Sequence, residues 1–450
     1  MKTGVRQVRS GGVLATSMWR PSRIRAAAVL AAVGALALSG CGTDVDDITV
    51  GPGTGWPAAY HDSRNSAASP ITGARKVALS WSRPIGGPIA EAVTIGPDGQ
   101  IFLTTRTPNC AIFSFQMATG RKRFCNKLEP NAISSPSLVD GMTNVYIGDD
   151  SHVTSFNYLG QPRWSTTVAG TPVSLQFTGD GTLITVTQSG QVDVLSRQTG
   201  ERLVPTVQLL GEPDYLAHPD LTWPAAGQGL DDCRTGGPQC PVANISAVDA
   251  ASGRFFVTLW QPGKPTAALI ALRYANNKIQ QEWHADMLSG GSATSPTLST
   301  DGKTVYVGDN SKRLIAVDTS DGRTKWVQPL EWAPRGGISV SSDGLIIPSG
   351  DEGYLLALRD KGDVPEIAWE RKDLALRGTP VQTAGGTGYT TATIGDGLNL
   401  ITFDTGSGAT IDSDVLPDAA GATTGTSVSA KGEIVVATRI GELFAFVPEH

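Results

Sequence analysis

The sequence has few of the residues from which hydrolytic and metal-dependent active sites are built. Only five histidines occur in 450 residues, and none pairs with a glutamate at the helical spacing of zinc hydrolases. No Gly-x-Ser-x-Gly elbow is present, and Gly51–Gly55 does not open a strand-to-helix turn. The pairings His61–Asp62 and His284–Asp286 fit turn or capping roles better than acid–base chemistry. The sequence therefore favours no catalytic residue, no metal ligand and no cofactor.

Cysteine and helical periodicity are also scarce. The five cysteines include neither an adjacent Cys-Cys pair nor a Cys-x-x-Cys spacing, which disfavours a zinc site. The chain contains 53 glycines and 28 prolines and little sustained helical pattern. This composition is typical of a turn-rich, all-β domain, and the chain is long enough for a large core.

The first 40 residues are expected to be a signal peptide. Met1–Arg25 carries six basic residues and no acid, and Ala26–Leu38 is an apolar run of 13 residues. That run is shorter than the roughly 20 residues of a bilayer span. Leu38–Cys41 resembles the lipobox of bacterial lipoproteins, which implies that Cys41 is diacylated and becomes the mature N-terminus. An ordinary signal with a chance cysteine is the alternative, and translation could also start at Met18.

Removal of the signal changes the charge balance. The mature chain would keep 30 basic and 42 acidic side chains, a net charge near −12. Such a surface repels nucleic acid and anionic headgroups, so we expect no nucleic-acid partner and attachment to the membrane through acyl chains alone. Residues 41–55 are acidic and Gly-rich and are expected to form a flexible tether. The protein would then lie at the outer leaflet of the cell membrane or envelope.

The stretch from Gly291 to Trp326 contains a motif that recurs along the chain. Short β-branched and aromatic runs alternate with polar turns, which predicts an antiparallel meander of short strands. Its frame is Ala316-x-Asp318-x-x-x-Gly322-x-x-x-Trp326. Further copies end at Phe124, Trp164, Val204, Trp283, Trp369 and Asp412. With Trp326 included, successive end points are 40, 40, 79, 43, 43 and 43 residues apart, a period typical of β-propeller blades.

The two ends of the chain are expected to share one blade. Ala78–Trp81 looks like a closing strand without preceding strands, whereas Ile434–Ala437 and Glu442–Val447 are strands without a closing one. The sequence therefore predicts a ring closed by pairing of the terminal strands, which removes open sheet edges. Seven internal end points and Trp81 give an eight-bladed propeller over residues 56–450. Seven blades is the alternative, if the copy ending at Asp412 belongs to its neighbour.

Trp56–Pro70, the Ala316–Trp326 frame and the eightfold count resemble the bacterial PQQ-like, or quinoprotein-type, β-propellers. The resemblance covers about residues 56–450. It implies that the closing aromatic residues dock neighbouring blades on one another. These blade-docking residues are Trp81, Phe124, Trp164, Trp283, Trp326 and Trp369. A lipid-anchored single propeller is similar to the BamB-type envelope assembly factors.

The same superfamily contains quinoprotein dehydrogenases. These enzymes bind a quinone and Ca²⁺ at the propeller axis through clustered carboxylates and amides. The nearest acidic pairs in this chain, Asp149–Asp150 and Asp231–Asp232, are expected in turns rather than as ligands. A quinone-dependent sugar or alcohol dehydrogenase is therefore the alternative function.

Four cysteines remain besides Cys41, an even number in an exported protein. Cys110 and Cys125 are expected near the open end of one hairpin, where a cross-strand disulfide fits. Cys233 and Cys240 bracket a short turn-forming loop that a second disulfide would close.

Residues 205–241 interrupt the repeat and explain the gap of 79 residues. A long, stapled loop with apolar side chains is typical of a binding site, and a segment that folds back over a blade is the alternative. Tyr215, His218 and Trp223 are the candidate partner contacts, and Trp332 and Arg335 are a second pair. The favoured function is a monomeric, non-catalytic binding scaffold. It would contact proteins or glycolipid intermediates during assembly of the cell envelope.

Overall fold

The computed structural model describes residues 51–107, 110–128, 135–211, 229–350 and 352–449, all within the second of two units, 49–450. In this part of the chain nearly all regular structure is β, as the sequence predicts. A single short helix, α2 (Leu230–Cys233), is found in the described residues. The expected signal peptide, the acylation site Cys41 and the candidate contacts Tyr215, His218 and Trp223 lie outside them.

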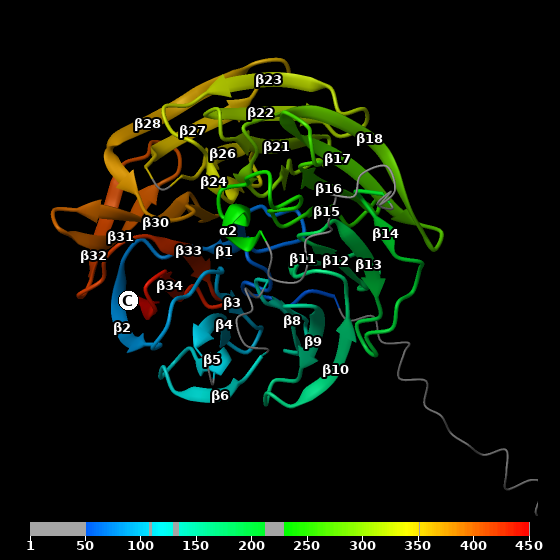
Figure 1. Cartoon of the computed structure of the whole chain (residues 1–450). Coiled ribbons are helices and arrows are strands. Elements are labelled where there is room, and N and C mark those ends of the chain that lie inside the picture. The colour runs from blue at the N-terminus through cyan, green and yellow to red at the C-terminus, as the bar shows by residue number, and fades with distance from the viewer. Residues whose placement is uncertain (1–50, 108–109, 129–134, 212–228, 351, 450) are drawn as a thin grey trace, which may run out of the picture. The chain divides into compact units, whose positions relative to one another are not determined.

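Six sheets contain four strands each, arranged side by side around a ring in Figure 1. Two of them are β3 (Thr94–Ile95), β4 (Gln100–Thr107), β5 (Cys110–Gln116), β6 (Lys122–Asn126) and β7 (Leu138–Val139), β8 (Val145–Asp149), β9 (His152–Phe156), β10 (Pro162–Thr167). The next two are β11 (Pro172–Phe177), β12 (Leu183–Thr187), β13 (Gln191–Leu195), β14 (Val207–Gln208) and β15 (Ala247–Asp249), β16 (Arg254–Leu259), β17 (Thr266–Ala275), β18 (Lys278–Ser289). The last two are β20 (Thr297–Leu298), β21 (Thr304–Asp309), β22 (Arg313–Asp318), β23 (Thr324–Pro329) and β33 (Thr423–Val428), β34 (Ile434–Thr438), β35 (Glu442–Pro448), β2 (Val77–Pro84).

A nine-stranded sheet contains two further meanders, because β28 also pairs with β30. The first meander is β25 (Ile338–Val340), β26 (Leu345–Pro348), β27 (Tyr354–Asp360), β28 (Pro365–Leu376). The second is β29 (Val381–Ala384), β30 (Thr387–Ile394), β31 (Gly397–Asp404), β32 (Thr410–Leu416), and β1 (Ala68–Thr72) pairs with β29. A small sheet joins β19 (Ala293–Thr294) to β24 (Arg335–Gly336). The architecture is that of a β-propeller, and the count of eight blades stays a prediction, since two meanders share one sheet.

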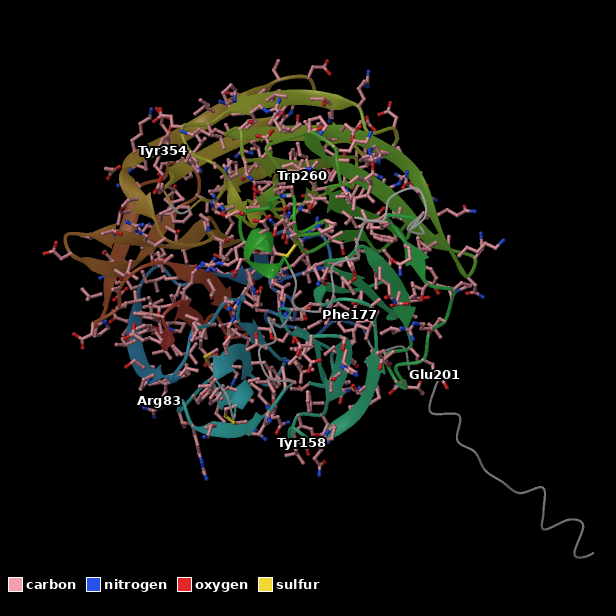
Figure 2. All side chains as sticks on the ribbon, in the orientation of Figure 1. Arg83, Tyr158, Phe177, Glu201, Trp260 and Tyr354 are labelled. Carbon is pink, nitrogen blue, oxygen red and sulfur yellow. A yellow bond between two sulfur atoms is a disulfide. The ribbon has the colours of Figure 1, made fainter. Side chains whose placement is uncertain are left out.

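The second strand of each meander lies deep in the core. All five residues of β8 and of β12 are buried, for example, because neighbouring sheets pack face to face over them. Val305 of β21 and Phe256 of β16 belong to one hydrophobic cluster shared by two sheets. Figure 2 shows Phe177 among the inner strands and Tyr158 at the periphery, in agreement with their exposures of 3 % and 45 %.

The closure predicted from the two chain ends is confirmed. β2 pairs antiparallel with β35, with Trp81 opposite Ala445. Trp81 and Phe444 also share a hydrophobic cluster with Ile101 of β4, so the last sheet packs on the first. This pairing removes what would otherwise be two open sheet edges.

A β-bulge recurs just before the closing position of the fourth strand. In β23, Trp326 lies opposite Ala316 and the register shifts by one residue immediately before it. The same shift precedes Trp81, Phe124, Trp164, Trp283, Trp369 and Asp412. A bulge increases the local twist and re-aims the next side chain. It explains why the repeat frame keeps its spacing even where the aromatic residue is replaced by aspartate.

The segment 51–73 crosses the inner strands of successive sheets. Its backbone groups bond to Ile95, Val139, Val248, Leu298, Val340 and Gln382. Gly51 and Gly53, which the sequence places in the flexible tether, already bond to Gly141 and Val139. The tether expected to reach residue 55 is therefore held to the sheets from Gly51 onward.

Both predicted disulfides are confirmed. Cys110 is bonded to Cys125 across the β5–β6 hairpin, and Cys233 to Cys240 around the loop that follows α2. Within the described residues, no helix has the length and apolar character needed to cross a membrane.

Candidate functional site: an axial funnel

A cavity of about 480 Å³ opens where the inner strands of most sheets begin. Its lining comes from the loops that lead into β3, β7, β11, β15, β20 and β25, and from Ala59 and Tyr60 of the crossing segment. Since this segment runs across the inner strands, it closes the cavity at one end. We call this cavity the axial funnel. Its charged side chains are Glu91, Arg106, Asp231, Arg234, Arg335 and Arg439.

Three of these groups gather where the ring closes. Glu91 lies in the linker between β2 and β3, which joins the last sheet to the first. Arg439 donates from Nη1 to the carbonyl of Ala90 at 3.3 Å, and the Arg106 amide donates to the carbonyl of Pro88 at 3.4 Å. The two arginines, one from each flanking sheet, therefore both contact the linker that carries Glu91.

The other two arginines come from the opposite wall. Arg234 follows α2 directly, inside the loop that the Cys233–Cys240 disulfide closes. Arg335 lies in β24 and donates from Nη1 to the Arg234 carbonyl at 3.2 Å. Asn310 donates to the carbonyl of Thr235 at 2.7 Å. These contacts tie the disulfide loop to the sheets and place both arginines at the funnel.

The funnel is rich in positive charge. None of its four arginines has a carboxylate within 4.0 Å among the residues that the structure describes. The Nε atom of Arg439 is buried and has no hydrogen-bond partner. Burying such a donor costs free energy unless a ligand or water accepts its proton. The arrangement is therefore suited to binding an anion.

Burial also changes the acid–base behaviour of the funnel. It raises the pKa of Glu91 to about 7, since the charges of Arg439, Arg106 and Arg234 offset it only in part. Burial, together with the negative charge of Glu91, raises the pKa of Tyr60 to about 12, so the phenol stays protonated. Near neutral pH Glu91 is thus partly protonated and able to donate a hydrogen bond.

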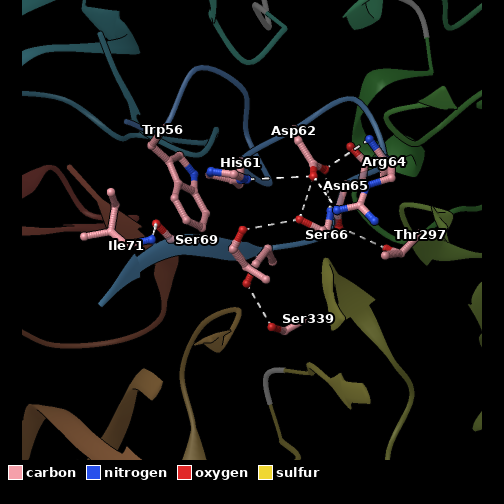
Figure 3. A network of polar contacts seen from close by, with 12 residues as sticks. Trp56, His61, Asp62, Arg64, Asn65, Ser66, Ser69, Ile71, Thr297 and Ser339 are labelled. Atoms are coloured by element: carbon pink, nitrogen blue, oxygen red, sulfur yellow. Dashed lines mark hydrogen bonds and ion pairs between the residues drawn. The ribbon is translucent and has the colours of Figure 1, made fainter. Parts of the chain in front are cut away.

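The crossing segment that closes the funnel is fixed by a polar network, drawn in Figure 3. Asp62 accepts hydrogen bonds from Arg64 (3.0 Å) and from the hydroxyl of Ser66 (2.9 Å). Burial alone would raise the pKa of Asp62, but nearby His61, Arg64 and the Ser66 amide lower it to about 2. His61 Nδ1 is 3.8 Å from Asp62, too far for a hydrogen bond, so this pair has a structural role.

Asn65 is a fully buried polar group of this segment. Its Nδ2 donates to the carbonyls of Pro296 (2.9 Å), Ser246 (3.2 Å) and Ile245 (3.3 Å), and its Oδ1 accepts from Gln176 (2.8 Å). One side chain thereby links three sheets. Its φ of 59° is left-handed, a conformation that asparagine tolerates better than most residues.

The funnel does not fit a quinone held through a metal ion. Among the described residues no group of three or more His, Cys, Asp or Glu side chains is placed to hold a metal. The carboxylates that line the funnel are Glu91 and Asp231, whereas Ca²⁺ takes six to eight oxygen ligands. Tyr60 is the aromatic residue of the described lining, and the Cys233–Cys240 pair is not adjacent in sequence. No reaction step through such a cofactor follows from these residues.

The aromatic residues expected to dock blades lie against the neighbouring sheet. Trp81, Phe124, Trp164, Trp283 and Trp369 face Gly120, Gly160, Gly200, Gly322 and Gly408, each in a turn of the next meander. Trp326 instead donates from Nε1 to Asp360 of β27 at 2.9 Å. All six contacts cross from one meander to the next.

The second pair of candidate contacts is divided by the structure. Arg335 lines the funnel, as described above. Trp332 is only 4 % exposed and packs against Tyr354, with ring centroids 4.5 Å apart, so it belongs to the core rather than to a surface that a partner could reach. The indole packs inward because Gly350 and Gly353, which lack side chains, leave room for it. The stretch expected as an insertion from residue 205 also includes β14, which pairs with β13 as the fourth strand of its sheet.

Sequence reasoning missed Glu91, Arg106, Arg234 and Arg439. The sequence does contain a signal for Arg106 and Arg439. Both follow a threonine at the end of the second strand of their meander. The same position in other meanders holds an uncharged or acidic residue: Asp150, Gln188 or Asn310. Their proximity depends on ring closure, which brings together residues more than 300 positions apart. The repeat frame alone does not show which strand ends face the axis.

Comparison with known proteins identifies the relatives of the chain. The family model described as "Outer membrane protein assembly factor BamB" matches residues 63–208 and 243–449. Protein Rv3035 of Mycobacterium tuberculosis (strain H37Rv) is 34% identical over 419 residues, which cover 91% of this chain and 100% of that protein. BamB from Moraxella catarrhalis has a TM-score of 0.57 at 17% identity and covers 82% of this chain and 99% of its own. Quinohemoprotein alcohol dehydrogenase from Comamonas testosteroni has a TM-score of 0.62 at 13% identity, with coverages of 87% and 80%. The last two likenesses concern the fold alone.

Proposed function

The chain belongs to the family described as outer membrane protein assembly factor BamB, and we propose that it is a non-catalytic binding scaffold of the bacterial cell envelope. The observation that carries the proposal is the axial funnel, which is lined by cationic side chains and lacks a cluster of metal ligands among the described residues. A fold shared with dehydrogenases does not by itself confer their chemistry. Binding therefore accounts for the site better than catalysis.

The position of the protein in the cell is part of the proposal. The apolar run Ala26–Leu38 and the lipobox-like Leu38–Cys41 support export and acylation of Cys41. Two disulfides are in keeping with an oxidising compartment. Mass spectrometry of the membrane-extracted protein should find a mature N-terminus at Cys41 that carries fatty acid. An unmodified Cys41, or a terminus elsewhere, would remove the anchor from the proposal.

The funnel side of the propeller is the face proposed to meet the partner, because the crossing segment occupies the other end of the axis. A photo-crosslinking amino acid at Thr235, which is exposed in the disulfide loop beside the funnel, should capture an envelope protein or glycolipid in intact cells. The matched control is Met142, which is 60% exposed in the β7–β8 turn beside Gly51. Capture from residue 142 and not from residue 235 would assign partner binding to the opposite face.

The alternative, a quinone-dependent dehydrogenase, is supported only by a likeness of fold to alcohol dehydrogenases of low sequence identity. The full-length protein should show no dye-linked oxidation of aldoses or alcohols after incubation with the quinone and Ca²⁺. Stoichiometric, Ca²⁺-dependent quinone binding accompanied by turnover would replace the scaffold proposal with the enzyme.

A further inference from the structure

We propose that the axial funnel binds a diphosphate group through its four arginines, which we call the funnel arginines: Arg106, Arg234, Arg335 and Arg439. The inference rests on the proposed function only in using the same side of the propeller. It concerns the chemistry of the ligand, and it holds or fails independently of membrane anchoring.

The funnel carries an excess of positive charge. Four guanidinium groups face two carboxyl groups, Glu91 and Asp231, in a chain whose overall net charge is −6. The excess of positive charge is therefore local. A single carboxylate would neutralise only one of these cations, whereas a diphosphate carries several negative charges and many acceptor oxygens. Guanidinium groups also match phosphate oxygens in bidentate geometry.

Two of the funnel arginines are held in place, and one of their donors is unsatisfied. Arg439 Nε is buried without a partner, although Nη1 of the same group is tied to Ala90. Arg335 is held by its bond to the Arg234 carbonyl. A preorganised donor loses little side-chain entropy when an anion arrives, which increases affinity. Arg335 and Arg439 are thus held at the funnel before an anion binds.

The size of the funnel also fits a diphosphate. A volume of about 480 Å³ exceeds what a single phosphate needs and falls within the roughly 300–1,000 Å³ typical of small-molecule sites. The space suits a diphosphate together with an attached group such as a sugar. A soluble sugar diphosphate and a lipid-linked diphosphate share this chemistry and differ only in what lies outside the funnel.

Binding should depend on pH through Glu91. The groups that act on it are Arg439, Arg106 and Arg234, which favour its ionised form, with Tyr60 close by and Asp231 across the cavity. A bound anion favours protonated Glu91, so binding above pH 7 takes up a proton. The affinity should then fall by up to about tenfold per pH unit above 7.

The test uses full-length protein in detergent and inorganic pyrophosphate, with binding measured by isothermal titration calorimetry at low salt. The double variant R106Q/R439Q should bind at least tenfold more weakly than the wild-type protein. The double variant R121Q/R323Q removes the same number of charges from exposed turns of β5–β6 and β22–β23 and should bind like the wild type. Equal binding by the two double variants, or no binding by the wild-type protein, would overturn the proposal.

A second variant guards against a folding defect in the first. Glu91→Gln keeps all four arginines and should lose the fall in affinity above pH 7 that the wild-type protein shows, since the group that takes up the proton is gone. Persistence of the wild-type pH dependence in this variant would contradict the role of Glu91. Binding of citrate in preference to pyrophosphate would overturn the assignment to phosphoryl groups.

Two further arms distinguish the source of the diphosphate. A soluble sugar nucleotide is titrated into the protein, and vesicles containing a polyprenyl diphosphate are compared with neutral phosphatidylcholine vesicles in a flotation assay. Binding in either arm that R106Q/R439Q abolishes supports the site and identifies the source. Because the pyrophosphate titration uses isolated protein, its failure is separable from a failure to capture partners in cells.

Discussion

The indole of Trp283 in β18 lies directly on Gly322, in the turn between β22 and β23 of the next sheet. A Cβ atom added to Gly322 would be 2.7 Å from Trp283 Cε3, and Trp283 Nε1 donates to the carbonyl of Thr319 at 3.0 Å. The glycine also has a left-handed φ of 76°. The turn is therefore shaped both by the backbone and by the tryptophan of the sheet before it.

Gly322→Ala should destabilise the protein by about 2–5 kcal/mol, because the new methyl group meets the indole and the left-handed backbone disfavours a side chain. Gly263→Ala is the control, since Gly263 has a φ of 77° and a Cβ atom added there would have no heavy atom within 4 Å. The free energy of unfolding of the control should fall by only about 1 kcal/mol. Urea unfolding measures both, and equal losses would mean that the tryptophan contact contributes nothing.

Asn65→Asp should cost about 3–5 kcal/mol of stability, since a carboxylate would replace the amide that donates to three buried carbonyls. Asn277→Asp is the matched control: Asn277 is exposed and has a similar φ of 56°. The control should change stability by no more than about 0.5 kcal/mol. A small effect at Asn65 would show that the crossing segment does not hold the sheets together.

Asp414→Asn should stabilise the protein at neutral pH. Burial, with the charges of Asp412 and Glu449, raises the pKa of Asp414 to about 6. Because the pKa of Asp414 is higher in the folded state, its contribution to the free energy of unfolding is fully present only below the unfolded pKa near 4. That stability is lost as the pH rises through 6. The advantage of the variant should therefore grow between pH 4 and 6 and stay constant above. The measurement is the free energy of unfolding at several pH values across this range. Asp363→Asn, at an exposed position, is the control for the loss of one charge. A difference between Asp414→Asn and the wild type that does not change with pH would contradict the expectation.

The double variant Cys233→Ser/Cys240→Ser should loosen the funnel wall locally. The disulfide spans 7 residues, and the chain-entropy estimate for so short a loop is about 2–3 kcal/mol. Amide hydrogen exchange of residues 229–240 should accelerate, while the β-sheets keep their protection. The corresponding Cys110→Ser/Cys125→Ser variant should leave exchange in residues 229–240 unchanged. Unchanged exchange in the first variant would mean that the loop is held by the sheets rather than by its own disulfide.

Much of the architecture could be predicted from the sequence, because each blade is specified locally. The spacing from Ala316 to Trp326 fixes a hairpin and a bulge, and the bulge recurs before every other predicted closing position except Val204. Closure by Trp81 could also be predicted, since an unpaired strand at each end has one economical solution. The burial of Trp332 could not, because it depends on Gly350 and Gly353 of a neighbouring turn.

The candidate site was the least predictable part. The position of Arg335 between two blades can be seen in the sequence. The charged residues that share the funnel with it come from loops far away in the chain. Arg106 and Arg439 are separated by most of the chain and share one linker only after β2 pairs with β35.

The sequence by itself determined the repeating unit and the pairing of its cysteines, since short strands, tight turns and nearby thiols depend on neighbours within about one repeat. It also determined the joining of the chain ends, because each end carries a strand that has no local partner. The tertiary structure alone decided which charged residues meet. Closing the ring carries Glu91 and the four arginines to a common cavity, where desolvation raises the pKa of Glu91 and the Nε atom of Arg439 is buried without a partner.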